Sequence, residues 1–392
     1  MKFITDLDVK GKLVFLRVDF NVPLDDKGAI RDDTRIRASL PTIQYLLDHG
    51  ARLVIASHLG RPKGKPDPKM SLRPAAQRLA ELVPNRIIMA PDVVGDEVDR
   101  LKQGLKNGEA LVLENVRFYK EEEANDPGFS RRLSEGIDIF VNDAFGSSHR
   151  AHASVVGIAD FVKVKATGFL MKKEVDYLQK AIRSPERPYV AILGGAKVSD
   201  KIEIIESLLN KADHILIGGA MAYTFLKAQG FGVGKSLVED DQKATALAIL
   251  AKAAEKKVDF LLPLDHVLAT AADAGAATRT VDTLPFPEDM MGVDIGPRTV
   301  EAFSRIIKNA KTIFWNGPMG IFEIEPFAAG TVKVAQAVAA SGAVSIVGGG
   351  DSIAAVKKAG VRDKISHIST GGGASLEYIA YGSLPGIDAL EK

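Results

Sequence analysis

The chain has 392 residues, of which 46% are hydrophobic and 26% charged, and it contains no cysteine. This length exceeds one ordinary hydrophobic core, which predicts two domains, and the missing cysteine excludes disulfides, thiolate metal sites and cysteine nucleophiles. The balance of 51 Lys and Arg against 50 Asp and Glu excludes a protein built as a whole to coat nucleic acid or an anionic membrane.

The first segment of the chain, MKFITDLDVKGK, carries charges where a secretory signal peptide needs an apolar centre. No apolar run further along approaches the ~18 residues of a membrane span. These features predict a soluble, cytoplasmic protein.

Strands are predicted where short apolar or β-branched runs occur, at Leu13–Val18, Leu53–Ala56, Ile87–Met89, Ala110–Leu113, Ile137–Val141, Tyr189–Leu193, His214–Ile217, Asp259–Leu262, Thr312–Trp315, Ala343–Val347 and Ser366–Ile368. Between most of them lie segments with helical periodicity, such as Lys201–Lys211, Ala244–Ala254 and Phe327–Ala340. Continuous apolar strands that alternate with helices are typical of parallel sheets covered on both faces. The fold class is therefore predicted to be α/β.

A domain boundary is predicted at Ala166–Gly168, because a helix-like segment with charges along one side follows from Phe169 to about Arg183. Pro185 and Pro188 then interrupt the chain before the next strand. A helix that joins two α/β lobes would divide the chain nearly in half.

Ligands of open α/β sheets bind beyond the carboxyl ends of the strands, so the segments after each strand are the candidates. In the first half these segments are DFN (19–21), HLGRPKG (58–64), ENVRFYKEEE (114–123) and NDAFGSSHRAHAS (142–154). The cationic or imidazole side chains in or near them are Arg35, His58, Arg61, Arg117, Arg150 and His152. Any one alone is more typical of a solvated surface charge. Together they predict a cleft for a small, multiply anionic substrate, because guanidinium forks suit carboxylate and phosphate oxygens.

Glycine takes the same positions in the second half. The strand-end segments are LGGAK (193–197), IGGAM (217–221), WNGPMGIFE (315–323), VGGGDS (347–352) and STGGGAS (369–375). One such turn is explained by helix–sheet packing, whereas their recurrence predicts a floor where backbone approaches a flat ring and a phosphate chain. Asp351 of GGGDS places a carboxylate at a helix start, where Mg²⁺ would be wanted.

The stretch from Gly194 to Lys201 has two readings by itself. A helix N-terminus favours anions, so Lys197 and Lys201 indicate a phosphate partner; if the helix begins near Val198, the two lysines lie about one turn apart on one face. A plain strand–helix turn with two solvated lysines explains the same residues equally well.

Four alternative interpretations lack support in the sequence. GFGVGKS (230–236) imitates a phosphate-binding Walker loop, but Gln229 stands where that motif requires glycine. A dehydrogenase would need G-x-G-x-x-G between a strand and a helix, and a non-catalytic sugar-phosphate sensor would not need two lysines and GGGD in a separate lobe. The histidines show no spacing typical of a zinc site.

The motifs RVDFNVP, SHLGRPKG, ENVRFYKEE, NDAFGSSHRAHASVVG, AILGGAKVSDKI, WNGPMGIFE, IVGGGDS and STGGGAS occur in this order. In this respect the chain resembles the bacterial-type phosphoglycerate kinases over essentially its whole length. The resemblance implies two Rossmann-like three-layer domains with parallel sheets, joined by an interdomain helix: residues 1–168 with a tail at about 384–392 for phosphoglycerate, and residues 169–383 for nucleotide. It also implies a monomeric, Mg²⁺-dependent glycolytic enzyme that converts 1,3-bisphosphoglycerate and ADP reversibly into 3-phosphoglycerate and ATP.

Site residues follow from the same resemblance. The phosphoglycerate contacts would be Asp19, Phe20, Asn21, Arg35, His58, Leu59, Gly60, Arg61, Arg117 and Arg150. The nucleotide contacts would be Gly194, Lys201, Gly218, Asn316, Glu323, Gly348, Gly349, Gly350 and Asp351, with Asp351 also the metal ligand. The catalytic groups would be Arg35, Lys197, Lys201, Gly371 and Gly372. One departure from the family pattern is Ala220 in GGAMAYTF, where a third glycine is usual.

The implied chemistry needs no general base. In the reverse direction the nucleophile is a carboxylate, which is ionised at neutral pH because its pKa is roughly 4. Catalysis would then consist of positioning and of neutralising charge on the transferred phosphoryl group, with closure of the two lobes to exclude water.

Overall fold

The computed structural model describes residues 1–392, which form two compact units. Unit 1 comprises Met1–Asp176 and Ser383–Lys392, and unit 2 comprises Tyr177–Gly382. The chain passes from one unit to the other inside helix α6 (Phe169–Arg183). Every helix falls short of the length or the apolarity that a membrane span requires.

Unit 1 is built on a parallel sheet of six strands in the order β3-β4-β2-β1-β5-β6. The strands are β1 (Leu13–Arg17), β2 (Arg52–Ala56), β3 (Ile87–Met89), β4 (Ala110–Val112), β5 (Ile139–Asn142) and β6 (Val164–Thr167). The helices are α1 (Thr34–Asp48), α2 (Arg73–Leu82), α3 (Asp96–Gly104), α4 (Lys120–Glu123), α5 (Pro127–Ser134) and α14 (Pro385–Asp388).

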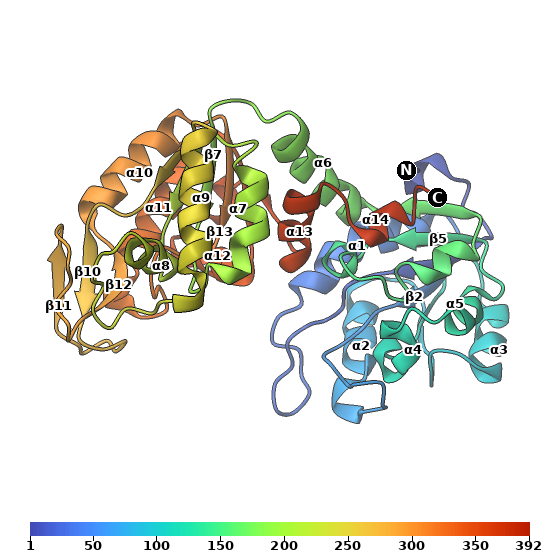
Figure 1. Ribbon diagram of the computed structural model, residues 1–392. Helices are drawn as coiled ribbons and strands as arrows, with labels where there is room; N and C mark the ends of the chain where they lie inside the picture. The colour runs from blue at the N-terminus through green and yellow to red at the C-terminus, as the bar shows by residue number, and fades with distance from the viewer. The chain divides into compact units, whose positions relative to one another are not determined.

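Alternate side chains of β1 enter the two cores of unit 1. Val14 and Leu16 pack in the cluster that contains the buried faces of α1 and α2. Phe15 packs in the opposite cluster, with residues of α3 and α5 and with Leu390 of the chain end. This period of two is the geometry of a strand buried on both faces, which explains why the strand is apolar throughout. In Figure 1 α14 lies beside β5, and Asn142 donates a hydrogen bond of 3.2 Å to the carbonyl of Gly386.

Unit 2 contains a second parallel sheet of six strands in the order β15-β14-β13-β7-β8-β9. Its strands are β7 (Tyr189–Leu193), β8 (His214–Ile217), β9 (Asp259–Leu261), β13 (Thr312–Asn316), β14 (Val344–Gly348) and β15 (His367–Ile368). Its helices are α7 (Ile202–Leu208), α8 (Met221–Ala228), α9 (Lys243–Glu255), α10 (Pro297–Asn309), α11 (Ala329–Ala340), α12 (Gly350–Lys358) and α13 (Gly373–Tyr381). Side chains of α10, α11 and α12 pack on one face, around the fully buried Trp315.

The predicted α/β class with parallel sheets is confirmed, but the structure contains an element that was not predicted. A three-stranded antiparallel sheet, β11-β10-β12, is formed by β10 (His266–Ala269), β11 (Thr278–Val281) and β12 (Met291–Ile295). Figure 1 shows it at one edge of unit 2. Strand β11 escaped prediction because it is largely exposed and polar, so no apolar run marks it; β10 and β12 are mostly buried and were also not predicted. Strand β6 was also missed, since only half of its residues are fully buried.

Candidate active site

Arg17, the last residue of β1, is fully buried at the carboxyl edge of the sheet in unit 1. Its Nε donates to Ser154 Oγ at 2.9 Å, and its Nη2 lies 3.2 Å from Nδ1 of His58. The Ser154 hydroxyl donates in turn to Oε1 of Glu122 at 2.6 Å. The motif RVDFNVP contained Arg17, but nothing in the sequence separated it from the strand, so it was not among the predicted site residues.

The DFN segment after β1 is hydrogen-bonded to the segment that follows β2. Asp19 accepts a 2.7 Å ion-pair hydrogen bond from Nη1 of Arg35, which stands in the first turns of α1. Asn21 accepts the backbone N–H of Gly60 at 2.9 Å. Phe20 is buried, and its N–H donates to Ser57. Asp19 and Asn21 therefore fix neighbouring groups, so their side chains serve the architecture of the loops in this structure.

Arg117 lies in the turn after β4 and is almost fully buried. Its Nη1 donates to the carbonyl of Gly60 at 2.9 Å, and its Nε lies 3.3 Å from a carboxylate oxygen of Glu123. Burial lowers the pKa of Arg117 to about 10; Glu123 opposes this shift, and Arg17 and Arg150 add to it. The guanidinium still carries its charge at neutral pH, among other cations.

Two buried histidines, His58 and His152, lie among these cationic side chains. Burial holds the pKa of His58 well below its usual range, and the charges of Arg17, Arg117 and Arg35 add to the effect. Burial and the neighbouring arginines likewise lower the pKa of His152 to about 3. Both rings are therefore neutral at physiological pH. Of the predicted cations, Arg35, Arg117 and Arg150 lie close enough to act on the pKa of one or both rings.

Two predicted residues of unit 1 do not take part in this cluster of arginines and histidines. Arg61 is exposed and contributes none of the interactions described above. Leu59 is buried, and its carbonyl accepts a hydrogen bond of 2.7 Å from the side-chain amide of Asn115. This hydrogen bond from Asn115 holds the backbone of the HLGR loop in place.

The glycines of unit 2 fall into two kinds. A Cβ atom on Gly194 would lie 2.0 Å from the carbonyl oxygen of Pro318, and one on Gly218 would lie 2.5 Å from the sulfur of Met319. These two glycines are required by close packing of the strand ends. Gly195 differs, because it has a φ of +111° and no atom would lie within 4 Å of an added Cβ. The Cα of Gly195 faces open space, as expected of a ligand-binding floor, whereas its N–H donates to Pro318 and its carbonyl accepts from Met221.

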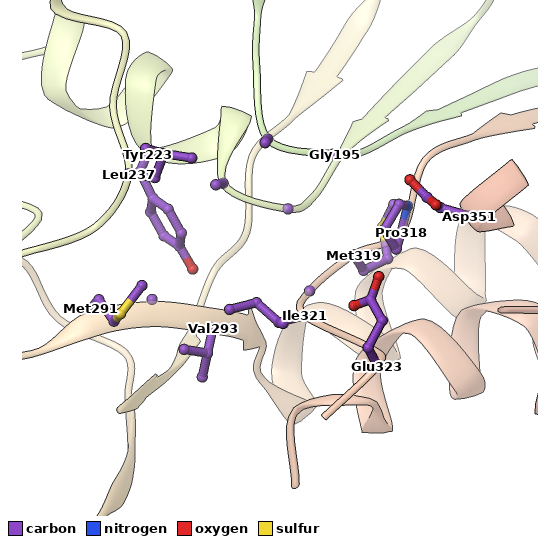
Figure 2. Close-up of a pocket in the computed structure, with 15 residues that line it drawn as sticks. Gly195, Tyr223, Leu237, Met291, Val293, Pro318, Met319, Ile321, Glu323 and Asp351 are labelled. Atoms are coloured by element: carbon purple, nitrogen blue, oxygen red, sulfur yellow. The ribbon is translucent and has the colours of Figure 1, made fainter. Parts of the chain in front are cut away.

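A pocket of about 260 Å³ opens above this floor. Figure 2 shows Tyr223 pointing into it from α8, with Met291 and Val293 of β12 along the opposite side. Its lining also includes Leu237, Ala220, Met319 and Ile321, with the carboxylates of Glu323 and Asp351. The wall supplied by β12 was not predicted, because the antiparallel sheet was not. An apolar slot with polar groups at one end is typical of a site for a planar ring with a polar extension.

Lys201 and the strand ends form a connected polar group. The Lys201 ammonium donates to Oδ1 of Asn316, and the Asn316 amide donates to the carbonyl of Gly348 at 2.6 Å. Burial lowers the pKa of Lys201, while Asp200 and Asp351 oppose that shift. The lysine is thus half-buried near carboxylates at the end of β13.

The helical segment that follows Val198 begins as a 3₁₀ turn and not as an α-helix. A 3₁₀ turn covers Ser199–Lys201, and α7 begins only at Ile202. Lys197 and Lys201 therefore do not share one regular helical turn: Lys197 is exposed, whereas Lys201 is half-buried. The 3₁₀ turn separates the two lysines into different surroundings.

The remaining glycine segments stand at helix starts. Gly349 is the N-cap of α12, with a φ of +92°, and Gly350 and Asp351 lie in its first turn. Gly371 donates its N–H to Ser369 Oγ at 3.2 Å, and Gly372 is the N-cap of α13.

No group of three or more His, Asp or Glu side chains is arranged to hold a metal ion. Asp351 is an exposed carboxylate at the polar end of the pocket, which it lines together with Glu323. Such a donor set fits Mg²⁺ that arrives with phosphate oxygens, since Mg²⁺ commonly takes one or two carboxylates together with substrate phosphates. It does not fit a metal held by protein alone.

Comparisons with known proteins all match the same enzyme family. A family model described as phosphoglycerate kinase matches residues 4–381. The chain is 59% identical over 398 residues to the phosphoglycerate kinase of Acidobacterium capsulatum, covering 99% of this chain and 98% of that protein. It is 57% identical over 393 residues to that of Anaeromyxobacter sp. (strain Fw109-5), with coverages of 100% and 99%.

Solved structures give the same result. Phosphoglycerate kinase from Coxiella burnetii superposes with a TM-score of 0.91 at 42% identity, covering 99% of this chain and 97% of that one. The enzyme from Pyrococcus horikoshii OT3 gives a TM-score of 0.82 at 37% identity, with coverages of 100% and 98%.

Proposed function

Because this chain belongs to the phosphoglycerate kinase family, we propose that its two units hold the two substrates of the reaction separately. The resemblance drawn from the sequence motifs is confirmed. The chain is a glycolytic phosphotransferase, which moves a phosphoryl group reversibly between 1,3-bisphosphoglycerate and ADP to give 3-phosphoglycerate and ATP. What the proposal adds is the place of each substrate, the role of each residue and the metal.

Unit 1 is the proposed phosphoglycerate site. It is supported by the gathering of Arg35, Arg117 and Arg150 around two neutral histidines, as their effects on one another's pKa indicate. Guanidinium groups bind the carboxylate and phosphate of the substrate in bidentate fashion, and neutral His58 supplies a directional hydrogen bond. Asp19 and Asn21 hold Arg35 and Gly60 in position.

Unit 2 is the proposed nucleotide site. The pocket beside Tyr223 takes the adenine ring, and Glu323 accepts hydrogen bonds from the ribose hydroxyls. The backbone of Gly195 and the first turn of α12 approach the phosphate chain, where Lys201 supplies positive charge. The observation that carries this assignment is the apolar pocket whose polar end joins Glu323 and Asp351.

Asp351 is the residue that would hold Mg²⁺, together with the nucleotide's own oxygens. When bound, the metal would neutralise negative charge on the phosphates. The exposed position of Asp351 at the first turn of α12 suits this role, because the carboxylate remains accessible to an incoming metal–nucleotide complex.

The chain's own residues then need only position the ligands and balance charge. The substrate carboxylate is ionised at neutral pH, since its pKa is roughly 4, and attacks without a general base. Arg35, Lys197 and Lys201 are the proposed cations for the moving phosphoryl group, with the N–H groups at Gly371 and Gly372 as further donors. Direct transfer requires the two ligands to meet, so closure of the units belongs to this proposal, as do a monomeric state and a cytoplasmic location.

Calorimetric titration of each substrate tests the division between the units. Arg150→Met should weaken binding of 3-phosphoglycerate and leave binding of Mg²⁺-ADP near wild type. Ile321→Trp, which narrows the unit 2 pocket at a partly exposed position, should do the reverse. If either variant weakens both ligands alike, or weakens the wrong one, the assignment of substrates to units is incorrect.

A further inference from the structure

Arg17 lies behind the proposed phosphoglycerate site and has no solvent access to a ligand. Its side chain is 1% exposed. Nε donates to Ser154, Nη1 donates to the carbonyl of Val18, and Nη2 faces Nδ1 of His58 at 3.2 Å. Every nitrogen of the guanidinium thus has a defined partner, which makes the group a fixed part of the interior.

The chemistry of this contact determines where His58 carries its proton. A guanidinium has five N–H donors and no acceptor, so the ring nitrogen that faces it must offer a lone pair. Nδ1 of His58 is therefore unprotonated, and the proton of the neutral ring resides on Nε2. If Nδ1 were protonated as well, its N–H would face an N–H of Arg17, and the imidazolium cation would lie against the guanidinium cation.

The surroundings of His58 oppose any second proton. The charged or titratable groups that act on it are Arg17 of β1, Arg35 of α1, Arg117 after β4 and His152 after β5. Each of these four groups lowers the pKa of His58 and so disfavours an imidazolium; the carboxylates of Asp19 and Glu122 act on Arg17. His58 is itself only 5% exposed, which leaves little water to stabilise that charge.

Arg17 is held in turn from the opposite side. Glu122 of α4 is fully buried and accepts both the backbone N–H and the hydroxyl of Ser154, at 2.9 and 2.6 Å. Its negative charge also acts on Arg17 in the direction that keeps the guanidinium protonated. The sequence Glu122, Ser154, Arg17, His58 is a buried chain of hydrogen bonds whose geometry is set before any ligand binds.

We propose that Arg17 is a positioning residue, which fixes His58 as the neutral Nε2–H tautomer so that this ring edge donates a hydrogen bond to an oxyanion of phosphoglycerate. The tautomer follows from the contacts of the free protein, whereas the identity of the oxyanion rests on the proposed function of unit 1. A neutral donor of this kind gives direction without contributing charge, and it does not depend on the proton concentration near neutrality.

Long-range ¹H–¹⁵N spectra of the histidine side chains, in the full-length enzyme without substrate, test the tautomer. His58→Gln identifies the His58 signals by their loss. We expect an unprotonated Nδ1 and a protonated Nε2, unchanged across the range around pH 6.5 in which an ordinary histidine titrates. An unprotonated Nε2, or a doubly protonated ring, overturns the proposal.

Two variants test the role of Arg17. Arg17→Met should let His58 sample both tautomers, and should weaken 3-phosphoglycerate binding by roughly ten- to a hundredfold, as for one hydrogen bond to a charged group. Because that variant leaves Glu122 unpaired in the interior, Ser154→Ala serves as the second test. It keeps both charges and should shift the tautomer balance in the same direction by less. A folded Arg17→Met enzyme with an unchanged His58 spectrum overturns the proposal.

Replacing the ring itself separates this inference from the assignment of the substrate. Glutamine places its amide nitrogen near the position of Nε2, whereas asparagine places it near Nδ1. His58→Gln should therefore retain 3-phosphoglycerate affinity within about tenfold of wild type, and His58→Asn should lose more. If the tautomer is as expected but neither variant changes affinity, Arg17 still sets the tautomer and the proposed ligand of His58 is wrong.

Discussion

Two arginines of unit 1 show how surroundings assign different roles to one residue type. Arg17 is buried, and every nitrogen of its guanidinium has a hydrogen-bond partner in the protein. It is therefore held in the interior, where it positions Ser154 and His58. Arg35 pairs with Asp19 through one nitrogen while its side chain remains 37% exposed. Its fork can still turn toward a ligand, which suits a residue that acts on substrate.

Arg35→Lys should lower kcat by on the order of 10², while 3-phosphoglycerate affinity weakens only modestly. Lysine keeps the charge but lacks the planar fork that can hold Asp19 and a phosphoryl oxygen together. Interactions made only with the transferring group affect kcat and not ground-state binding. Steady-state kinetics beside calorimetric titration of 3-phosphoglycerate separate the two effects.

The control for that experiment is Arg37→Lys on the same helix. Arg37 is exposed and pairs with Asp33 at 2.9 Å, and it is not part of the proposed site. It should leave both parameters near wild type. A collapse of affinity with kcat preserved in Arg35→Lys would instead make Arg35 a ground-state anchor for the substrate.

Asp351→Asn should weaken the use of Mg²⁺-nucleotide more than the binding of nucleotide without metal. The change removes the charge that would hold the metal but keeps the shape of the side chain. Titrating ADP with and without Mg²⁺, and measuring activity as Mg²⁺ is varied, gives the comparison. Wild-type activity at every Mg²⁺ concentration would reduce Asp351 to the role of an acidic residue in the first turn of α12.

At the scale of elements, the junction between β14 and α12 joins packing to the proposed nucleotide site. Asn316 at the end of β13 donates to Gly348 and accepts from Lys201, and Ser352 of α12 accepts the N–H of Gly317 at 2.6 Å. The strand ends and the helix start therefore hold one another. A change in the backbone at this junction should therefore alter the position of the Lys201 side chain.

Gly349→Ala should raise the KM for ADP and lower kcat, with little effect on 3-phosphoglycerate binding. Gly349 has a φ of +92°, and a Cβ atom would lie 2.6 Å from Nδ2 of Asn316. The methyl group would strain the backbone by roughly 1–3 kcal/mol and displace Asn316, which holds Lys201. Steady-state kinetics with each substrate varied provide the measurement.

Gly350→Ala is the matched control, one residue further along. Gly350 is helical, and no atom would lie within 4 Å of an added Cβ. This variant should therefore keep wild-type stability and raise the KM for ADP less than Gly349→Ala does, because the added methyl group can disturb only the bound nucleotide. Equal losses in the two variants would mean that the segment tolerates no side chain because of the ligand and not because of Asn316.

At the scale of the whole molecule, each unit has its own parallel sheet and contains a buried aspartate whose pKa is strongly raised. Burial raises the pKa of Asp143 in unit 1 to about 7, and that of Asp294 in unit 2 to about 7. Asp143 accepts the N–H of Met171 near the start of α6, and Asp294 accepts the N–H of Gly330 near the start of α11. Both acids bind a proton more tightly in the folded chain than in the unfolded one.

Asp294→Asn should flatten the dependence of unit 2 stability on pH. In the wild type the folded state holds a proton that the unfolded chain releases, so the free energy of unfolding should fall as pH rises from 3.8 to about 7. Asparagine does not titrate, although it loses roughly 1 kcal/mol at all pH values through one weakened hydrogen bond. Trp315, the single tryptophan and fully buried, reports denaturant unfolding of this unit by fluorescence.

The matched control is Asp143→Asn, which changes the corresponding acid of unit 1. It should leave the pH slope of the Trp315 transition closer to wild type. An Asp294→Asn protein with the wild-type slope would show that another group is responsible for the pH dependence of unit 2.

The sequence by itself determined the local elements and the family. Continuous apolar runs marked most strands of both parallel sheets, because a strand buried on two faces must be apolar at every position. Long motifs at the strand ends were sufficient to infer phosphoglycerate kinase. Arg35, Lys201 and Asp351 were found in this way, since they stand in segments whose residue types are unusual for plain turns.

Only the tertiary structure decided which residues share an environment. Arg17 meets Ser154 across 137 positions of sequence, and no local pattern encodes that contact. The wall that Met291 and Val293 give to the pocket depends on an antiparallel sheet whose edge strand β11 has no apolar run. Likewise, Gly194 and Gly195 are identical in sequence but differ in role, because a Cβ atom would meet the Pro318 carbonyl at Gly194 and open space at Gly195. Burial and partners depend on distant segments, and these are fixed only when the chain is folded.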